Sequence, residues 1–444
     1  MKKLFTIVLV FLSLSVIAGS KSDRDGNFGS ANTWKNNTVP ADNDNVDINS
    51  TVTVAANASY TVNRLNVRNK KELRIYGRLV INNSLILKNQ SNLTVYEGGE
   101  LIVNDRVVLE NKSNLDVKQG GRFEGNDLNS FTLKNGTSLV LDGVADIDVK
   151  GDFKQENQSS IVVGGEANLN VGGNYRLKNK TSLSVSGSAN LDVKGNFIQE
   201  NRSQVSFEGN ANLNVGGNYD LKTSTSLTVS GSADIDVSQN LTQFHNASIN
   251  FSGIAQLGVG NEITLKTQAE INATGNADVT INSDINLEAH NSGLNAYDDS
   301  IVRVNGSISG KGNVSVKDNA QLGASGDVTA DVKNGNVKDI DDISNDLVAN
   351  KAVEINANRT YDNVTINPGA TLVIAEGITF TVRGNFTNNG TFTDNGATVN
   401  FSGTNKEIDG ASTTTFNTVN FNGSTVLNAT VEVIAEANVN GTLD

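Results

Sequence analysis

Carboxylates and basic residues recur together in the middle of this chain. Asp146 and Asp148 are followed by Lys150, two positions along the same strand pattern. Similar residues return further along the chain, at Lys194, Asp234 and Asp236. Several acids beside a base, often with calcium, are the groups that polysaccharide lyases and hydrolases use. An active site should be one special cluster, whereas these residues recur with a regular period. We therefore predict no catalytic residue and a protein that is not an enzyme, with a polysaccharide-processing protein as the alternative.

Residues for other kinds of catalysis are scarce. The chain has no cysteine, which excludes thiol catalysis and thiolate metal sites. Its two histidines, His245 and His290, are far apart in sequence. His245 occupies a position that elsewhere holds asparagine, such as Asn157 and Asn179, so a turn residue is the better interpretation. We predict no cofactor.

Two short segments, 23–26 and 42–45, are rich in Asp and Asn and resemble oxygen-rich calcium loops. The nonapeptide glycine and aspartate pattern of calcium-binding β-rolls is absent, so solvated turns and no metal site are predicted. Asn-x-Ser/Thr sequences also recur, at Asn89, Asn111, Asn157, Asn179, Asn201 and Asn246. They coincide with the same recurring turn position, where asparagine suits a left-handed backbone conformation, so glycosylation is not required to explain them.

The elements that position these residues follow from a repeat of 22 residues. Its leading apolar position is occupied in succession by Leu183, Val205, Leu227, Ile249 and Ile271. Glycine stands four positions after the leading residue and alanine six positions after it, as in Gly187 and Ala189. Apolar or small residues occupy every second position, which is the periodicity of a strand with one face inward.

A fixed repeat with this alternation predicts an all-β fold, a right-handed parallel β-helix or solenoid with ~22-residue coils stacked ~4.8 Å apart. A rhythm of 44 residues lies on top of it. One inward position alternates between glutamine and leucine, as in Gln155 and Leu177, and one outward position alternates between Asp148 and Asn170. Such alternation separates like charges along a rod by roughly 9.6 Å rather than one coil spacing.

Composition agrees with a long, thin core. The chain has 444 residues with 42 Gly, 2 Pro and 5% aromatic residues, which does not suit one compact globular core. The net charge of -13 argues against nucleic acid and anionic lipid as partners, since both require a basic patch.

The chain divides into five predicted segments. Residues 1–20 have the charge, apolar run and small residues of a signal peptide. Residues 21–50 contain Phe28 and Trp34 and are predicted to cap the first coil, and 51–331 form the main solenoid. Ile340 and Ile343 recur at helical spacing among acidic residues, so 332–350 are predicted to be a connector or capping helix. The pattern of 52–60 returns at 353–361, which predicts a second, shorter β-solenoid module over 351–444. No later stretch is long and apolar enough to span a membrane in the mature chain.

Several short motifs carry a resemblance. Thr33-Trp34 and Val39-Pro40 near the start, and the sequence at 384–392, resemble repeat-rich exported surface proteins of Gram-negative bacteria. The middle of the chain, at 229–237, resembles the head domains of autotransporter adhesins. The resemblance implies a β-solenoid at the cell surface, often adhesive, and it identifies no catalytic residue.

These observations predict a non-enzymatic extracellular or cell-surface structural protein, an adhesin or surface scaffold that presents a polar acidic face. The alternative is a polysaccharide-processing or glycan-binding β-helix protein. The expected partners are glycans or proteins of a host, a matrix or a neighbouring cell, and no nucleic acid. The expected location is secreted, extracellular or at the surface of a Gram-negative-type bacterium.

Overall fold

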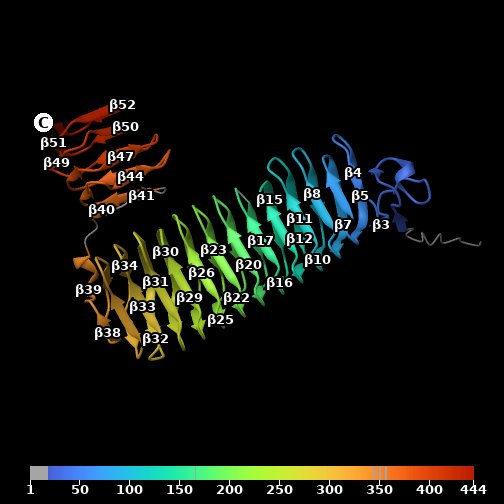
Figure 1. The fold of residues 1–444 in the computed structure, drawn as a ribbon, viewed down its shortest axis with the longest axis horizontal. Coiled ribbons are helices and arrows are strands. Elements are labelled where there is room, and N and C mark those ends of the chain that lie inside the picture. Colours follow the sequence, from blue (N-terminus) through green and yellow to red (C-terminus); the bar gives the residue numbers. More distant parts are fainter. Residues whose placement is uncertain (1–18, 166, 344–345, 350–351, 356–357) are drawn as a thin grey trace, which may run out of the picture.

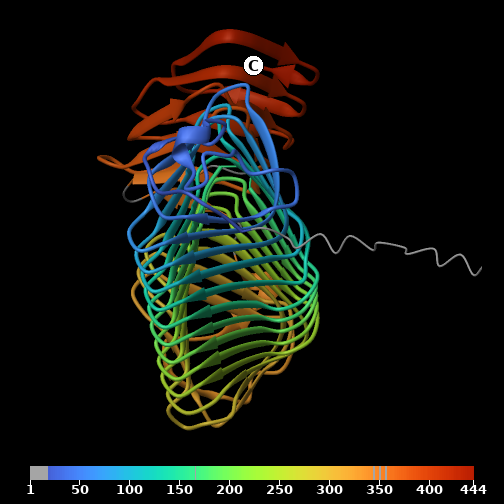
Figure 2. The ribbon, with the colours of Figure 1, turned by 90° about the vertical axis from the view of Figure 1, so that its right-hand side faces the viewer.

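The chain is a long stack of β-coils followed by a second, shorter stack (Figure 1). The computed structural model describes residues 19–165, 167–343, 346–349, 352–355 and 358–444. Most of the predicted signal peptide, residues 1–18, lies outside these ranges, and Gly19 and Ser20 belong to the first strand. Paired strands of successive coils run parallel, and the coils follow one another down the rod (Figure 2).

The register of the stack is the one that the 22-residue period predicts. Leu183 pairs with Val205, and Val205 pairs with Leu227 on the next coil. Each coil therefore places its leading apolar residue directly against the same position of its neighbours. This confirms the prediction of an all-β parallel solenoid with about 22 residues per coil.

One face of the main stack is a continuous parallel sheet of 15 strands. Its strands, in spatial order, are β2 (Gly26–Asn27), β4 (Val52–Val54), β6 (Glu72–Ile75), β8 (Asn92–Val95), β11 (Asn114–Val117), β14 (Ser138–Leu141), β17 (Ser160–Val163), β20 (Ser182–Val185), β23 (Gln204–Phe207), β26 (Ser226–Val229), β29 (Ser248–Phe251), β31 (Glu270–Ala273), β33 (Gly293–Ala296), β36 (Asn313–Val316) and β38 (Asp331–Asn334). We call it face one.

The other two faces are joined because four long strands turn the corner between them without a break. These are β5 (Ser59–Arg68), β7 (Arg78–Lys88), β30 (Ile254–Leu265) and β32 (Asp278–Leu287). Face two also contains β9 (Glu100–Val103), β12 (Arg122–Leu128), β15 (Val144–Val149), β18 (Asn168–Val171), β21 (Asn190–Val193), β24 (Asn212–Val215), β27 (Asp234–Val237), β34 (Ile301–Val304), β37 (Gln321–Ala324) and β39 (Lys338–Asp339). Face three also contains β1 (Gly19–Lys21), β3 (Asn45–Ile48), β10 (Arg106–Glu110), β13 (Ser130–Lys134), β16 (Phe153–Glu156), β19 (Tyr175–Lys178), β22 (Phe197–Glu200), β25 (Tyr219–Lys222), β28 (Leu241–Phe244) and β35 (Ile308–Gly310).

The core is the narrow space that the three faces enclose. Along β18, Leu169 and Val171 are buried while Asn168 and Asn170 are partly exposed, and the same alternation recurs from coil to coil. Aromatic side chains of face three stack through the interior, with 4.6 Å between the ring centroids of Phe153 and Tyr175. Each coil buries little apolar surface alone, so stability depends on stacking between neighbouring coils.

Glycine stands where the chain turns from face one to face two. Gly209 has φ 73°, and a Cβ there would lie 3.1 Å from the carbonyl oxygen of Gly187. The left-handed backbone and the close approach of the preceding coil both favour glycine at this column. Ala189, two positions after Gly187, is fully buried.

The first coil is covered by residues near the start of the described chain. Phe28 and Trp34 are buried and meet edge to face, with 5.0 Å between their ring centroids. The indole Nε1 of Trp34 donates a hydrogen bond to the carbonyl oxygen of Phe28 (2.7 Å). A short 3-10 helix, η1 (Ala31–Thr33), leads into Trp34.

The prediction of a helix over 332–350 is wrong for the described part of this segment, which forms strands and a 3-10 turn. β38 and β39 continue two faces of the solenoid, a 3-10 turn, η2 (Ile340–Asp342), follows, and Leu347–Ala349 form a strand that pairs within the second module. The carboxylate of Asp339 accepts a hydrogen bond from the backbone N–H of Asp341, which starts this turn (3.1 Å). Edge strands offer unpaired backbone groups, so pairing with the preceding coil outweighs the helical spacing of the apolar residues. Ile343 is buried against Gly323 and covers the last coil.

The second module has the same parallel construction in three smaller sheets. The first is β40 (Leu347–Ala349), β43 (Val364–Ile366), β46 (Phe386–Asn388), β49 (Lys406–Asp409), β51 (Ser424–Leu427) and β53 (Thr442–Leu443). The second is β41 (Ala352–Ile355), β44 (Thr371–Ile374) and β47 (Thr391–Asp394). The third is β42 (Arg359–Tyr361), β45 (Thr379–Val382), β48 (Thr398–Phe401), β50 (Thr414–Phe421) and β52 (Val431–Val439).

The second module packs against the flank of the main solenoid. Ile254 belongs to the main stack, yet it is buried in the apolar cluster of the second module together with Tyr361. Burial raises the pKa of Tyr361 well above its ordinary value. The contact therefore involves an apolar core and not only the connecting chain.

Candidate functional site

The surface most suited to binding is the corner between faces three and one. Most coils turn this corner through three residues, and the first two of them in one coil, Asn157 and Gln158, have left-handed backbones, with φ 54° and 63°. Asparagine adopts this conformation more readily than most residues. The backbone N–H groups of the pair donate to carbonyl oxygens of the next coil, at Lys178 and Asn179. The corner is thus rigidly repeated along the rod.

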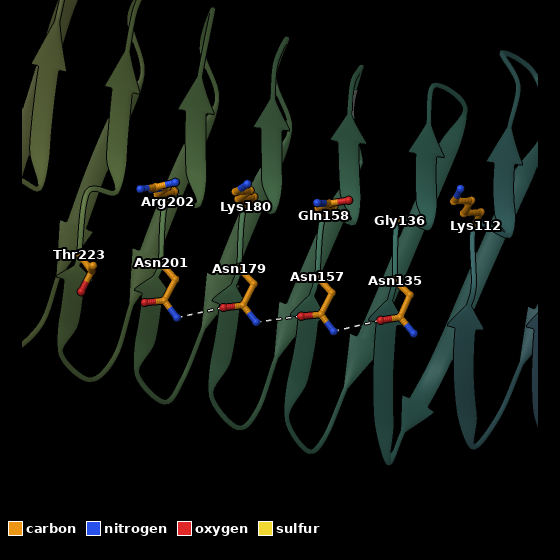
Figure 3. A pocket seen from close by; sticks show the side chains of 10 residues that line it. All are labelled: Lys112, Asn135, Gly136, Asn157, Gln158, Asn179, Lys180, Asn201, Arg202 and Thr223. Carbon is orange, nitrogen blue, oxygen red and sulfur yellow. Dashed lines mark hydrogen bonds between the residues drawn. The ribbon is translucent and has the colours of Figure 1, made fainter.

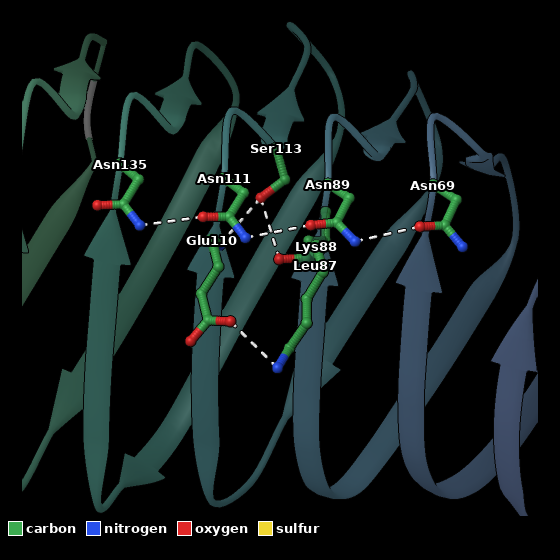
Figure 4. A network of polar contacts seen from close by, with 8 residues as sticks. All are labelled: Asn69, Leu87, Lys88, Asn89, Glu110, Asn111, Ser113 and Asn135. Atoms are coloured by element: carbon green, nitrogen blue, oxygen red, sulfur yellow. Dashed lines mark hydrogen bonds and ion pairs between the residues drawn. The ribbon is translucent and has the colours of Figure 1, made fainter.

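Asparagine side chains form a continuous ladder along this corner. In each step Nδ2 of one asparagine donates to Oδ1 of the asparagine on the preceding coil, over distances of 2.8 to 3.1 Å. The ladder consists of Asn69, Asn89, Asn111, Asn135, Asn157, Asn179 and Asn201 (Figures 3 and 4). We call these seven residues the Asn ladder. An amide nitrogen has two hydrogens, so each step keeps one donor that the ladder does not use.

A second row of side chains runs parallel to the ladder (Figure 3). It is formed by the residue after each asparagine, namely Lys70, Gln90, Lys112, Gly136, Gln158, Lys180 and Arg202. The four basic members are exposed, and none forms an ion pair with an acid among the residues that the structure describes. We call them the cation row. Their charge is therefore not neutralised by a described acid, although the net charge of the chain is -13.

The two rows line a shallow groove. One stretch, from Lys112 to Thr223, has a volume of about 640 Å³. A second stretch of about 530 Å³, from Asn69 to Asn135, continues it toward the N-terminal end and shares Lys112 with it. Over eight coils at ~4.8 Å each step, the groove is roughly 34 Å long.

The carboxylates nearest the groove already lie beside cations. The last outward position of face three alternates in sign from coil to coil, through Lys88, Glu110, Lys134, Glu156, Lys178, Glu200 and Lys222. Lys88 Nζ lies 3.1 Å from Glu110 Oε2 (Figure 4). Glu200 also accepts from the guanidinium of Arg176 (2.7 Å). These acids are therefore screened by their own neighbours and do not neutralise the cation row.

One break in this alternation is filled by an aromatic ring. Where the next glutamate should stand, Phe244 lies between two lysines, with Lys222 Nζ 5.9 Å and Lys266 Nζ 5.4 Å from the ring centroid. A ring face attracts ammonium groups, so Phe244 replaces the missing carboxylate in part.

The acidic residues singled out from the sequence form columns on face two. Asp148 and Asn170 are paired, and Asn170 Nδ2 donates to Asp148 Oδ1 (2.7 Å). Asn214 donates in the same way to Asp192. The alternation therefore links each acid to an amide in addition to separating the charges. Lys150 and Lys194 lie beside Asp148 and Asp192 around a shallow groove of about 340 Å³.

Asp146 and Asp234 stand at two ends of a neighbouring column that holds asparagine in between. Partial burial raises the pKa of Asp234 above its ordinary value, with Arg359 of the second module acting in the opposite direction. Asp236 lies beside it and is exposed. The two acidic pairs of the sequence, 146/148 and 234/236, are four coils apart and do not meet.

The two histidines stand at the groove corner beyond the Asn ladder. His245 has φ 47° and occupies the turn position that asparagine takes elsewhere. His290, two coils further on, is exposed, and its carbonyl oxygen accepts from Asn313 Nδ2 (2.8 Å). Neither histidine lines the groove beside Asp148 and Asp192.

One acid in each of the two candidate calcium loops accepts hydrogen bonds from protein donors. Asp44 Oδ2 accepts from the backbone N–H of Ala41 and from the hydroxyl of Ser20, both at 3.1 Å. Asp25 Oδ1 accepts from the backbone N–H of Thr51 (2.7 Å). Within the described ranges, no three His, Cys, Asp or Glu side chains gather in a way that could hold a metal ion.

The cation row is the feature that sequence reasoning did not find. The 22-residue repeat predicts the turn asparagines, but it does not by itself single out the residue after each of them. A signal was present, since Lys, Gln or Arg follows most of these asparagines. The overall negative charge concealed it, because net charge averages over faces that point in different directions.

Comparison with known proteins gave no family model, no curated protein and no solved structure that matches this chain. Among the residues described here, no helix is long and apolar enough to cross a membrane.

Proposed function

We propose that this chain is an exported, non-enzymatic protein of a bacterial surface, an adhesin or scaffold that acts through the outer faces of a stiff rod. The observation that carries the proposal is the uninterrupted sheet of 15 strands along face one, with two further faces of equal regularity. Parallel coils that satisfy each other's backbone hydrogen bonds form a straight, resistant spacer. The same outward position then recurs on each coil, so similar side chains are presented many times along one line.

The arrangement of the polar groups supports binding more than catalysis. The acids of face two recur with the period of the coil, and the grooves at both corners are shallow and repetitive. Catalysis requires a unique arrangement of groups held around one reacting bond. The polar acidic face and the basic corner are both suited to many weak contacts with an extended partner.

Export and a Gram-negative surface are part of this proposal. They are supported by the leader pattern of residues 1–20 and by the resemblance to autotransporter adhesin heads. Expression of the full chain in a Gram-negative host, followed by fractionation and mass determination of the N-terminus, tests them.

Adhesion is tested with the purified chain from residue 21 onward. We expect it to bind to cells or matrix without changing them, and to leave a panel of polysaccharides without new reducing ends or unsaturated products. Release of such products would favour the polysaccharide-processing alternative. Absence of binding to every surface tested would leave only a scaffold role.

A further inference from the structure

We infer that the groove between the Asn ladder and the cation row binds a linear polysaccharide that carries carboxylates, lying parallel to the axis of the rod. This inference rests on the proposed binding role of the protein and names the chemical class of its ligand.

The charge of the groove requires an anionic ligand. Lys112, Lys180 and Arg202 are exposed along one line and have no acid partner among the described residues. The bordering acids, such as Glu156 and Glu200, stand between lysines of neighbouring coils. A guanidinium or ammonium group facing a carboxylate gives a charge-assisted hydrogen bond, about twice as strong as a neutral one.

The hydrogen-bond donors of the groove require a periodic ligand. Each coil of the Asn ladder keeps one amide N–H that the ladder does not use, so donors recur every ~4.8 Å along the groove. A polysaccharide chain repeats its hydroxyl and ring oxygens at a regular spacing and can meet several of these donors in succession. The surface of a globular protein has no such period.

The lining disfavours nucleic acid. No aromatic side chain lines either stretch of the groove, whereas proteins that bind single strands stack bases on aromatic rings. A polysaccharide needs no stacking partner, and its hydroxyl and ring oxygens can accept from the amide N–H groups that the Asn ladder does not use.

The test replaces the central cations without disturbing the corner. The triple variant Lys112→Gln/Lys180→Gln/Arg202→Gln places at each position the residue that Gln90 and Gln158 already provide, with φ 64° and 63°. The matched control, Lys21→Gln/Lys35→Gln/Arg106→Gln, removes the same charge from exposed basic residues that line neither this groove nor the one on face two. Binding is measured by calorimetry with polygalacturonate oligomers, with the carboxyl-reduced form of the same oligomers, and with a single-stranded oligonucleotide.

We expect the unaltered chain to bind polygalacturonate oligomers, and the groove variant to bind them about tenfold or more weakly, since two or three charge-assisted contacts are lost. The control variant should stay within about twofold, and the carboxyl-reduced oligomers should bind far more weakly than the parent. Absence of polygalacturonate binding, equal losses in both variants, or tighter binding of the oligonucleotide would each overturn the inference.

The same variants separate this inference from the proposed function. If the groove variant adheres to cells or matrix as well as the unaltered chain, the groove is not the binding surface while the adhesin proposal stands. If the unaltered chain binds polygalacturonate and adheres to nothing, the adhesin proposal fails while the groove assignment stands.

Discussion

The hydroxyl of Tyr175 donates a hydrogen bond to Oε1 of Gln155 on the preceding coil, 3.1 Å away in the buried core. Nε2 of the same glutamine donates to the carbonyl oxygens of Ser159 and Ser182, so the buried amide is fully engaged. Tyr219 and Gln199 repeat this link two coils later, at 2.8 Å. The 44-residue rhythm therefore reflects a pairing of tyrosine with glutamine across coils. In the coils between, phenylalanine and leucine occupy the equivalent positions.

Removing the tyrosine hydroxyl should cost stability. Tyr175→Phe leaves Oε1 of Gln155 buried without a donor, and we expect the free energy of unfolding to fall by about 1–3 kcal/mol. Urea denaturation measures the change. The double variant Tyr175→Phe/Gln155→Leu is the control, because it recreates the pair that Phe197 and Leu177 form at the equivalent positions. It should recover much of the loss, and a double variant as unstable as the sum of the two single changes would contradict this explanation.

Replacing Gln243 with leucine should change the free energy of unfolding in the opposite direction to replacing a glutamine that is paired with tyrosine. The next coil has Ile263 at the position where tyrosine stands above Gln155 and Gln199, and Oε1 of Gln243 is buried with no hydrogen-bond partner among the described residues. Gln243→Leu should therefore raise the free energy of unfolding, by up to about 1 kcal/mol because the hydrogen bond from Nε2 to the carbonyl oxygen of Glu270 is lost as well. Gln199→Leu leaves the hydroxyl of Tyr219 buried without its acceptor and should lower the free energy of unfolding. Equal effects at the two sites would show that the tyrosine link is unimportant.

Asp234 provides a test of pH dependence. Its pKa is raised because partial burial disfavours the ionised form, so the ionised carboxylate opposes folding at neutral pH. This cost is fully present above the raised pKa and disappears as the pH falls through it toward the ordinary value for aspartate. Asp234→Asn, which extends the asparagine column of Asn190 and Asn212, should thus stabilise the protein at neutral pH and make little difference near pH ~4.

Thermal midpoints at the two pH values check this expectation. Asp236→Asn is the matched control, since Asp236 is an exposed neighbour on the same face. A stabilisation by Asp234→Asn that is independent of pH would indicate a gain from the added amide and not from removal of the buried charge.

The Asn ladder should tolerate glycine better than alanine. Asn157 has φ 54°, a conformation that costs roughly 1–2 kcal/mol for an ordinary side chain. Both Asn157→Gly and Asn157→Ala remove two ladder hydrogen bonds, so the difference between them isolates the backbone term. We expect the alanine variant to be less stable by about 1 kcal/mol in urea denaturation. Equal stabilities would mean that the corner relaxes when its side chain is lost.

Contact between the two modules should depend on Ile254. A charge at this position would be buried beside Tyr361 in the apolar cluster of the second module, which is strongly unfavourable. Ile254→Glu should release the second module from the flank of the rod, seen as a larger radius of gyration and faster proteolysis of the connector. Val144→Glu is the control because Val144 occupies the same column of face two and is 56% exposed. Unchanged dimensions in the Ile254 variant would place the contact elsewhere.

The repeat of 22 residues was sufficient to predict the coil, its register and its inward columns. A slip of one residue would turn every side chain of a strand to the opposite face, so the alternation around Leu183 and Val205 admits one register only. The glycine and alanine columns, the turn asparagines and the spacing of Asp148 and Asn170 follow from the same constraint.

Contacts between coils and across corners were decided by the tertiary structure. The link from Tyr175 to Gln155, the common line of Lys112 and Lys180, and the burial of Ile254 by the second module all join residues that no local pattern relates. The direction of a side chain at a left-handed corner depends on how the backbone turns there. The connector around Ile343 forms sheet and one 3-10 turn because the exposed edge of the last coil needs backbone partners, which is a property of the stack and not of the segment.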